Sequence, residues 1–543
     1  MEQQLTAQLV DIRQRRIYPA TIYWKDGIIS RIEESEQAPS RYILPGFVDA
    51  HVHIESSMLV PSEFARLAVV HGTVATVSDP HEIANVLGIE GVEFMIENGE
   101  KVPFKFYFGA PSCVPATSFE TAGAEIGPEG IEQLLQRPDI LYLSEMMNYP
   151  GVLHQQANVL AKIKLAQQYG KPIDGHAPGL RGEAAKAYAA AGISTDHECF
   201  TYEEAREKID HGMKILIREG SAAKNFEVLI PLLAEFPERI MFCSDDKHPD
   251  DLIKGHINQL VVRALQKGHD LFDILQAACL NPIEHYQLPI GQLRLGDPAD
   301  FIVVDSPERF QVLATYIDGQ QLASEGKSLI ARQPIHPINQ FRCQAKQAAD
   351  FAIKAKGDSL QAIKALDGEI VTERQILPAN VSADGLALSD VETDALKIAI
   401  VNRYQEAPPA VAFIHGFGLR QGAIASCVGH DSHNIIAVGT TDEAIAQAVN
   451  LVIEHQGGIS AVGADREKVL PLPVAGIMSD GDGYEVASRY AEIDQFVKQD
   501  LSCQLNAPFT TLSFMGLLVI PDLKLSDLGL FDGKTFSFCD PFV

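Results

Sequence analysis

Closely spaced cysteines are absent from this sequence. Its eight cysteines are scattered over 543 residues, and no two of them form a Cys-x-x-Cys pair. Structural zinc fingers, which depend on such pairs, are therefore disfavoured. Because nothing indicates a disulfide framework either, we expect a reduced, cytoplasmic protein.

Long apolar runs and an excess of positive charge are missing as well. No stretch reaches the length of a membrane span, and Met1-Glu2-Gln3-Gln4 does not begin a basic-then-apolar signal region. Lys and Arg number 44 against 72 Asp and Glu, which gives a formal net charge of −28. We therefore expect neither nucleic acid nor a membrane as a partner, whereas a neutral small molecule remains possible.

Two separated segments share a β-rich pattern. Residues 20–32 contain two strand-like runs around Asp26-Gly27, which is a hairpin signal, and residues 300–319 repeat that pattern. We expect segments 1–45 and 290–340 to pair into one small β-sandwich domain, with a larger domain inserted between them.

The inserted segment, residues 46–289, alternates strands and helices. Helices are expected, for example, at 152–168, 183–191 and 202–210. Strands are expected near 47–52, 73–78, 105–110, 139–144, 172–175, 192–196, 213–218 and 239–244. Eight such units in about 240 residues predict a (β/α)8 barrel, whose active site is built at the C-terminal ends of the strands.

The remaining segment, residues 345–543, has another character. Residues 422–428 and 434–438 resemble strands, and residues 441–454 have the pattern of an amphipathic helix. We expect a third domain of the α/β class here, which agrees with a chain long enough for roughly three domains of ~150 residues.

Histidines and carboxylates follow the predicted barrel strands. The first strand contains a His-x-His pair, and residues two apart on a strand point to the same face. The full set of strand-end candidates is His51, His53, Glu145, His176, His197 and Asp245. One ion rarely needs six protein ligands, so the set predicts two divalent metal ions with a bridging carboxylate. Donors without thiolates suit manganese, iron or zinc.

These residues lie in stretches that resemble the bacterial adenine deaminases of the amidohydrolase superfamily. The His-x-His motif is superfamily-wide, whereas Asp79-Pro80-His81-Glu82 and His430-Asp431-Ser432-His433-Asn434 are more specific to the family. The stretches that carry the resemblance are 45–58, 78–86, 175–179, 244–249 and 429–434. It covers nearly the whole chain and implies a metallo-dependent hydrolase barrel.

The resemblance also implies a chemistry. It implies hydrolytic deamination of adenine to hypoxanthine and ammonia in purine salvage, with manganese favoured over iron or zinc. Two metals would lower the pKa of a bridging water, and the resulting hydroxide would attack C6. Glu145 stands where many superfamily members use a carboxylated lysine, so we expect it to bridge the metals without such a modification. Asp245 is the expected proton shuttle, with Asp246 as the alternative.

Other residues are pocket candidates because they follow strands. His81 or Glu82 would contact the purine edge or protonate N1, whereas Asp79 would bind substrate or instead cap the next helix. Asp246 is also a substrate-binding candidate. Ser112 after the third strand and Arg218 after the seventh are substrate-binding candidates by position alone, and Arg218 has the alternative of pairing with a neighbouring carboxylate.

The role of His430, Asp431 and His433 is open from sequence. Their spacing permits another metal site, a tight turn before a buried strand, or completion of the substrate pocket. We favour a position near the active site.

Three other functions compete with adenine deamination. A related amidohydrolase would act on another 6-aminopurine or on a cyclic amide, as the dihydropyrimidinases do, although Glu145 argues against the latter. A non-catalytic scaffold would be expected to have lost ligands, and none of the six is missing. A zinc deaminase of the cytidine type is excluded because it needs Cys-x-x-Cys. We further expect a homodimer, as is frequent among barrel enzymes of this type.

Overall fold

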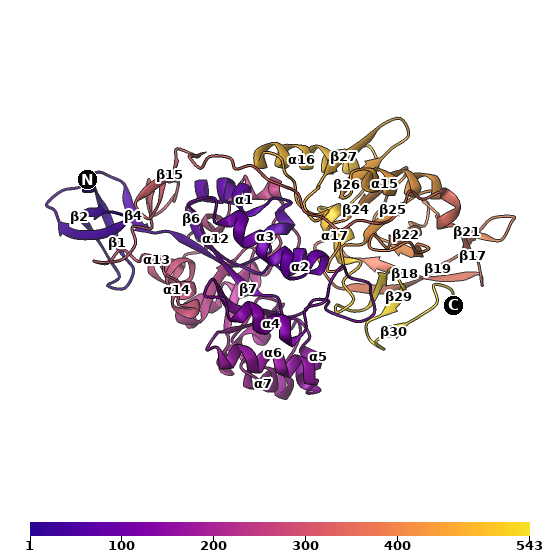
Figure 1. Cartoon of the computed structure of the whole chain (residues 1–543), viewed down its shortest axis with the longest axis horizontal. Helices are drawn as coiled ribbons and strands as arrows, with labels where there is room; N and C mark the ends of the chain where they lie inside the picture. The colour runs from indigo at the N-terminus through magenta and orange to yellow at the C-terminus, as the bar shows by residue number, and fades with distance from the viewer.

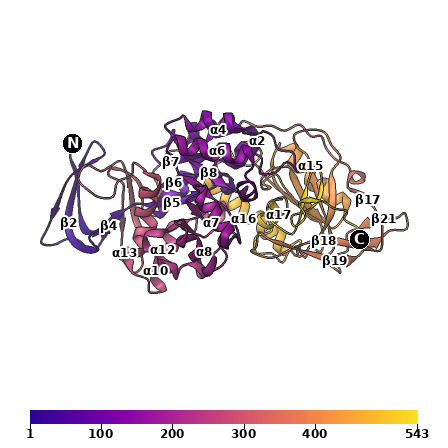
Figure 2. The ribbon, with the colours of Figure 1, turned by 90° about the horizontal axis from the view of Figure 1, so that it is seen from below.

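The computed structural model describes residues 1–543 as three parts in a row (Figure 1). A small sheet lies at the N-terminal end, the barrel lies in the middle, and the C-terminal domain lies at the other end. Figure 2 shows the same order after a quarter turn, so the arrangement is not an effect of projection. No helix combines the length and the apolar character that a membrane crossing requires.

The small sheet joins two distant segments of the chain. Its eight strands follow the order β16-β15-β14-β13-β4-β1-β2-β3. They are β1 (Gln3–Asp11), β2 (Arg16–Lys25), β3 (Ile28–Glu34), β4 (Tyr42–Pro45), β13 (Phe301–Val304), β14 (Val312–Ile317), β15 (Gln320–Ser324) and β16 (Lys327–Ser328). Antiparallel pairing of β4 with β13 joins the segments, and Trp24 Nε1 donates to the carbonyl of Gly319 at 3.0 Å across them.

The middle part is the predicted (β/α)8 barrel. Its parallel strands are β5 (Phe47–Val52), β6 (Thr73–Ser78), β7 (Lys105–Ala110), β8 (Ile140–Met146), β9 (Ile173–Gly175), β10 (Thr195–Asp196), β11 (Lys214–Arg218) and β12 (Ile240–Cys243). Two backbone hydrogen bonds, Asp245 N to His51 O at 2.9 Å and His53 N to Asp245 O at 3.2 Å, link the last strand to the first. The bond from Ser194 N to Ile173 O, at 2.9 Å, links β9 to β10. The strands are almost entirely buried, as expected for a parallel sheet covered by helices.

The barrel helices agree with the predicted pattern except at one place. They are α1 (Pro61–Ala68), α2 (His81–Leu87), α3 (Ile89–Gly99), α4 (Pro128–Leu135), α5 (Tyr149–Leu153), α6 (Ala157–Gln168), α7 (Gly182–Ala190), α8 (Tyr202–Asp210), α9 (Phe226–Leu229), α10 (Leu232–Glu235), α11 (Pro249–Leu252), α12 (Ile257–Gln266), α13 (Leu271–Leu275) and α14 (Asn281–Tyr286). The single helix predicted over 152–168 is wrong, because the chain forms α5 and α6 instead. Gln155 adopts a left-handed conformation with φ 54°, which no α-helix can continue through.

The C-terminal domain is an α/β domain around a second eight-stranded sheet. The strand order is β19-β18-β23-β22-β25-β24-β26-β27. The strands are β18 (Ser359–Ala365), β19 (Thr372–Pro378), β22 (Leu396–Val401), β23 (Ala410–His415), β24 (Ala423–Ser426), β25 (Ile435–Gly439), β26 (Gly458–Val462) and β27 (Glu467–Pro471). The helices are α15 (Asp442–Glu454), α16 (Gly483–Gln499) and α17 (Pro508–Phe514), and a small sheet of β28 (Leu523–Ser526), β29 (Gly529–Asp532) and β30 (Ser537–Phe538) follows.

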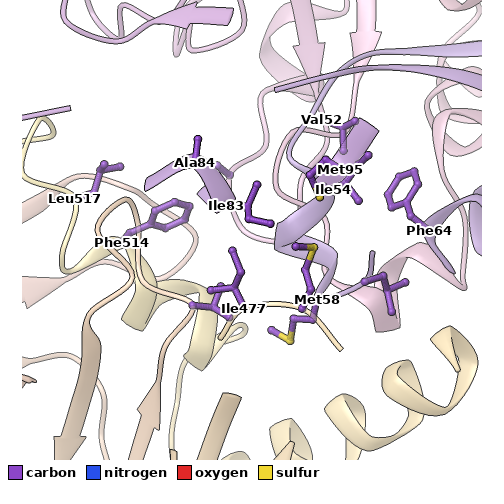
Figure 3. Close-up of a cluster of buried hydrophobic side chains, with 14 of the residues drawn as sticks. Val52, Ile54, Met58, Phe64, Ile83, Ala84, Met95, Ile477, Phe514 and Leu517 are labelled. Atoms are coloured by element: carbon purple, nitrogen blue, oxygen red, sulfur yellow. The ribbon is translucent and has the colours of Figure 1, made fainter. Parts of the chain in front are cut away.

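The barrel and the C-terminal domain share one hydrophobic core. Figure 3 shows Ile54, Met58 and Ile83 of the barrel gathered in one buried cluster with Ile477 and Phe514 of the C-terminal domain. These side chains are at most 4% exposed. The C-terminal domain is therefore packed against the mouth of the barrel, where β5 and β6 end.

Candidate metal centre

The His-x-His pair lies at the C-terminal end of β5 with both side chains directed to one point. His51 Nε2 and His53 Nε2 are 3.1 Å apart. His53 Nδ1 lies 3.2 Å from the carbonyl oxygen of Asp79, which fixes the ring proton on Nδ1 and leaves the Nε2 lone pair free. That lone pair faces Asp245 Oδ1 at 3.1 Å. Such an arrangement is typical of a histidine prepared to bind a metal ion.

Glu145, at the end of β8, lies between two groups of histidines. Its Oε1 is 3.2 Å from His53 Nε2 on one side. Its Oε2 is 3.2 Å from His197 Nε2 and 2.6 Å from His176 Nδ1 on the other. A carboxylate with one oxygen toward each group has the geometry needed to bridge two ions.

All six predicted ligands converge in this centre and are buried. The most exposed of them, His176, is 7% exposed. His197 Nε2, which faces Glu145 Oε2, is a buried nitrogen with no hydrogen-bond partner. A buried nitrogen left unpartnered beside a carboxylate is costly unless a cation binds there, so the donor set fits divalent metal ions.

The two carboxylates of the centre are held in the ionised form. Burial raises the pKa of Glu145, but the adjacent His176 and His197 outweigh it, so that the pKa lies well below its ordinary value. Burial likewise opposes ionisation of Asp245, and Arg218 with the histidines lowers its pKa well below the usual range. Asp245 also adopts φ 54°, a conformation rare outside glycine, and its Oδ1 faces both histidines of β5.

The chain matches two family models. The amidohydrolase family matches residues 42–322, and the adenine deaminase C-terminal domain matches residues 369–537. A protein of Salinibacter ruber named adenine deaminase is 57% identical over 540 residues, covering 99% of both chains. One of Methanosarcina mazei with the same name is 50% identical over 98% of both chains. The chain belongs to the adenine deaminase family.

In this member of the adenine deaminase family, three more of the predicted residues line the pocket that contains the candidate metal centre. His81 and Glu82, at the start of α2, face it, as does Asp246 beside the metal centre. Asp79 stands behind His81: its Oδ1 accepts from the His81 amide at 3.1 Å, and its Oδ2 is 3.2 Å from His81 Nδ1. Asp79 thus orients His81 and does not line the pocket.

The two candidates chosen by position alone, Ser112 and Arg218, already have hydrogen-bond partners within the protein. Ser112 donates its hydroxyl to the carbonyl of Glu145 at 2.5 Å and lines a separate cavity behind β8. Arg218 reaches the pocket wall, but its Nη1 donates to Asp245 Oδ2 at 2.6 Å, so its guanidinium is already paired with a carboxylate.

The C-terminal domain completes the pocket. His430 and Asp431, in the turn between β24 and β25, line it together with the apolar side chains of Ile370, Phe514 and Leu517. His430 stacks on Phe514 with ring centroids 5.0 Å apart. His433 does not reach the pocket but contacts Glu82 from behind, with Nε2 at 2.5 Å from Oε2.

Sequence reasoning missed one charged residue of the pocket. Glu198 lines it and pairs with both Nη atoms of Arg218, with Nη2 at 3.0 Å from Oε2. Its Oε1 lies 3.5 Å from His197 Nε2 and 3.7 Å from His176 Nδ1. The sequence could have indicated Glu198, since this residue directly follows a predicted ligand at the end of a barrel strand.

Proposed function

We propose that the chain catalyses the hydrolytic deamination of adenine to hypoxanthine and ammonia. The full-length match to proteins named adenine deaminase supports the substrate. The observation that carries the chemistry is the position of Glu145 between His53 on one side and His176 and His197 on the other. This geometry favours two ions over one.

The metal centre would be held by six side chains. Glu145 would bridge the ions, and the other ligands would be His51, His53, His176, His197 and Asp245. Two divalent ions, manganese by preference and iron or zinc otherwise, would supply an activated water for attack at C6 of the purine. The close approach and the burial of these six side chains in the fold support this assignment.

Asp245 would move the proton of the attacking water. Its Oδ1 faces the two histidines of β5, while its Oδ2 is anchored by Arg218 Nη1 at 2.6 Å. The anchored carboxylate is ionised and can accept a proton and pass it to the substrate, a transfer worth typically ~10²–10⁴ in rate. Arg218 then acts by holding Asp245, which differs from the direct substrate contact expected from its position.

The purine would lie between the metal centre and the C-terminal domain. His81, Glu82, Asp246 and His430 form the polar side of that space, and the side chain of Phe514 offers an aromatic face for stacking. The ionised carboxylate of Glu82 suits a hydrogen bond from a purine N–H. His81 is the candidate for protonating N1.

Domain bounds, cellular role and oligomeric state belong to the proposal as well. We propose the three domains bounded as 1–45 with 290–340, 46–289 and 345–543, and a role in purine salvage in the cytoplasm. We also propose a homodimer, for which light scattering should give twice the mass of the 59.2-kDa chain.

Substrate comparison tests the proposal. Manganese-loaded protein should release ammonia from adenine and should leave the ring of hydantoin intact. Ring opening of hydantoin without ammonia release from adenine would instead support the cyclic amide hydrolase. A faster reaction with another 6-aminopurine would retain the chemistry and change the substrate.

A further inference from the structure

Glu82 is one of the residues through which the C-terminal domain touches the polar side of the pocket. It is 1% exposed, and it stands at the start of α2 in the barrel. His430 Nδ1 is in close contact with Oε1, and His433 Nε2 lies 2.5 Å from Oε2. Each oxygen of this carboxylate therefore faces one imidazole of the C-terminal domain.

The two imidazoles have different positions relative to the substrate. His430 lines the pocket itself, beside Phe514. His433 is 1% exposed and does not line the pocket, so its side chain can act on the reaction only through its neighbours, and Glu82 is the neighbour that its Nε2 faces. His433 is therefore the better residue for testing whether the contact with Glu82 affects the reaction.

The tautomer of a neutral His433 ring follows from the contact made by its second nitrogen, Nδ1. The amide of Gly429 donates to His433 Nδ1 at 3.3 Å, so Nδ1 presents a lone pair. In the neutral ring the proton must then be on Nε2, the atom that faces Glu82. His433 therefore turns a protonated nitrogen toward the carboxylate in a close polar contact that lacks the angle of a regular hydrogen bond. A protonated Nε2 does not suit a metal ligand.

The turn that carries His433 is held from several sides. The His433 amide donates to the carbonyl of Gly429 at 2.8 Å. Tyr404 donates its hydroxyl to the carbonyl of Ser432 at 2.6 Å, and the amide of Arg403 donates to Asn434 Oδ1 at 3.0 Å. A donor on so restrained a turn can fix the direction of the carboxylate that it contacts.

We propose that His433 is a positioning residue for the deamination, acting through Glu82. Its Nε2–H orients the Glu82 carboxylate toward the purine edge, and the docking of the C-terminal domain thereby sets the geometry of the barrel's own pocket. This inference rests on the proposed function, because the orientation matters only if a purine binds beside Glu82.

Two substitutions separate this role from a purely structural one. His433→Asn keeps a side-chain oxygen for the Gly429 amide but is too short to reach Glu82. It also suits the local backbone, since His433 has φ 54° and asparagine tolerates that region well. His433→Gln does the reverse: it retains an N–H at the reach of Nε2 and is less suited to the backbone.

The positioning role predicts opposite orders for stability and activity. His433→Asn should have a thermal midpoint near that of the wild type and a full complement of metal, yet lose about 10- to 100-fold in kcat/KM for adenine. His433→Gln should recover most of that loss although it is no more stable. If kcat/KM instead follows stability, with the asparagine variant close to wild type, the proposal is overturned.

A double-mutant cycle with Glu82→Ala checks that His433 acts through Glu82. Adding His433→Asn to Glu82→Ala should cost little further activity, because the carboxylate that His433 contacts is already gone. Additive losses would overturn the positioning role and leave the proposed function intact. A wild-type protein that does not deaminate adenine would overturn the proposed function, and the inference with it.

Discussion

At the scale of single residues, the site depends on which nitrogen of a histidine carries the proton. His53 and His433 show the two outcomes. The carbonyl of Asp79 accepts from His53 Nδ1, which leaves a lone pair at Nε2 for a metal ion. The Gly429 amide donates to His433 Nδ1, which leaves a proton at Nε2 for Glu82. Backbone groups thus leave one imidazole able to bind a metal ion and turn an N–H of the other toward Glu82.

The first prediction concerns the proton shuttle. Asp245→Asn should give a folded protein whose kcat for adenine falls by ~10²–10⁴, because the amide cannot accept the proton of the attacking water. Activity is compared at equal metal content, determined by mass spectrometry, since Asp245 is also a proposed ligand.

The neighbouring Asp246→Asn is the matched control. Its Oδ1 accepts from Ser56 at 2.5 Å and makes no contact with the histidines of β5. We expect Asp246→Asn to lose less activity than Asp245→Asn. If Asp246→Asn loses more than Asp245→Asn, the shuttle is Asp246.

The second prediction concerns the His-x-His pair. His51→Asn and His53→Asn should each reduce the bound metal and the activity while the circular dichroism spectrum is retained, because both nitrogens face the same point. The exposed His154→Asn serves as the control and should bind metal as the wild type does. Full metal content in either variant of the pair would contradict a shared ion.

At the scale of elements, close strand contacts set the positions of the ligands. Gly175 ends β9 directly before His176, and a Cβ there would lie 2.4 Å from the carbonyl oxygen of Thr195 on β10. His197 follows β10 in turn. Only a glycine lets these two short strands approach closely enough to bring both histidines to Glu145.

The third prediction follows from this contact. Gly175→Ala should cost about 1–3 kcal/mol of stability, since backbone must move to admit the methyl group, and it should lower metal occupancy. Gly127→Ala is the control, because a Cβ at Gly127 meets no atom within 4 Å. Calorimetry and metal analysis of both variants measure the difference. Equal behaviour would show that the contact does not position the ligands.

A second element-scale feature joins the barrel to the C-terminal domain. Glu63 of α1 is fully buried, and its carboxylate accepts from the amide of Gly483, the first residue of α16, at 2.8 Å. It also pairs with Arg66 and with Arg332 Nε, the latter at 3.3 Å. An anion at a helix N-terminus is favourable, so this residue supports the docking of α16.

The fourth prediction tests that junction. Glu63→Gln should lower the free energy of unfolding by about 1–3 kcal/mol, because it weakens hydrogen bonds to a charged acceptor. Glu90→Gln, on the exposed face of α3, should change it by less than about 0.5 kcal/mol. Calorimetric scans compare the two. Equal thermal midpoints for both variants would show that Glu63 does not stabilise the interface between the two domains.

Sequence reasoning reached most elements of the barrel for a physical reason. Strands buried on both faces are short, continuous apolar runs, and each predicted run has an observed strand within a few residues. The break between the two helices at Gln155 was not predicted, because the left-handed conformation of this residue is not visible in an amphipathic sequence pattern.

At the scale of the whole molecule, the sequence predicted one side of the site better than the other. The proposed metal ligands follow strands of one barrel, and the barrel geometry alone brings these six side chains together. The contact of His433 with Glu82 joins residues 351 positions apart on different domains. It depends on how the C-terminal domain packs on the barrel mouth, which no local pattern encodes; the same holds for Phe514 and Leu517 in the pocket wall.

The account as a whole rests on a metal-dependent deamination of adenine, and one measurement tests it directly. Protein stripped of metal by a chelator and then titrated with manganese is followed by the absorbance change from adenine to hypoxanthine. We predict no turnover without metal and a rise in activity that continues until two ions are bound per chain. Undiminished turnover in the stripped protein, or no turnover of adenine with both ions bound, would contradict the account.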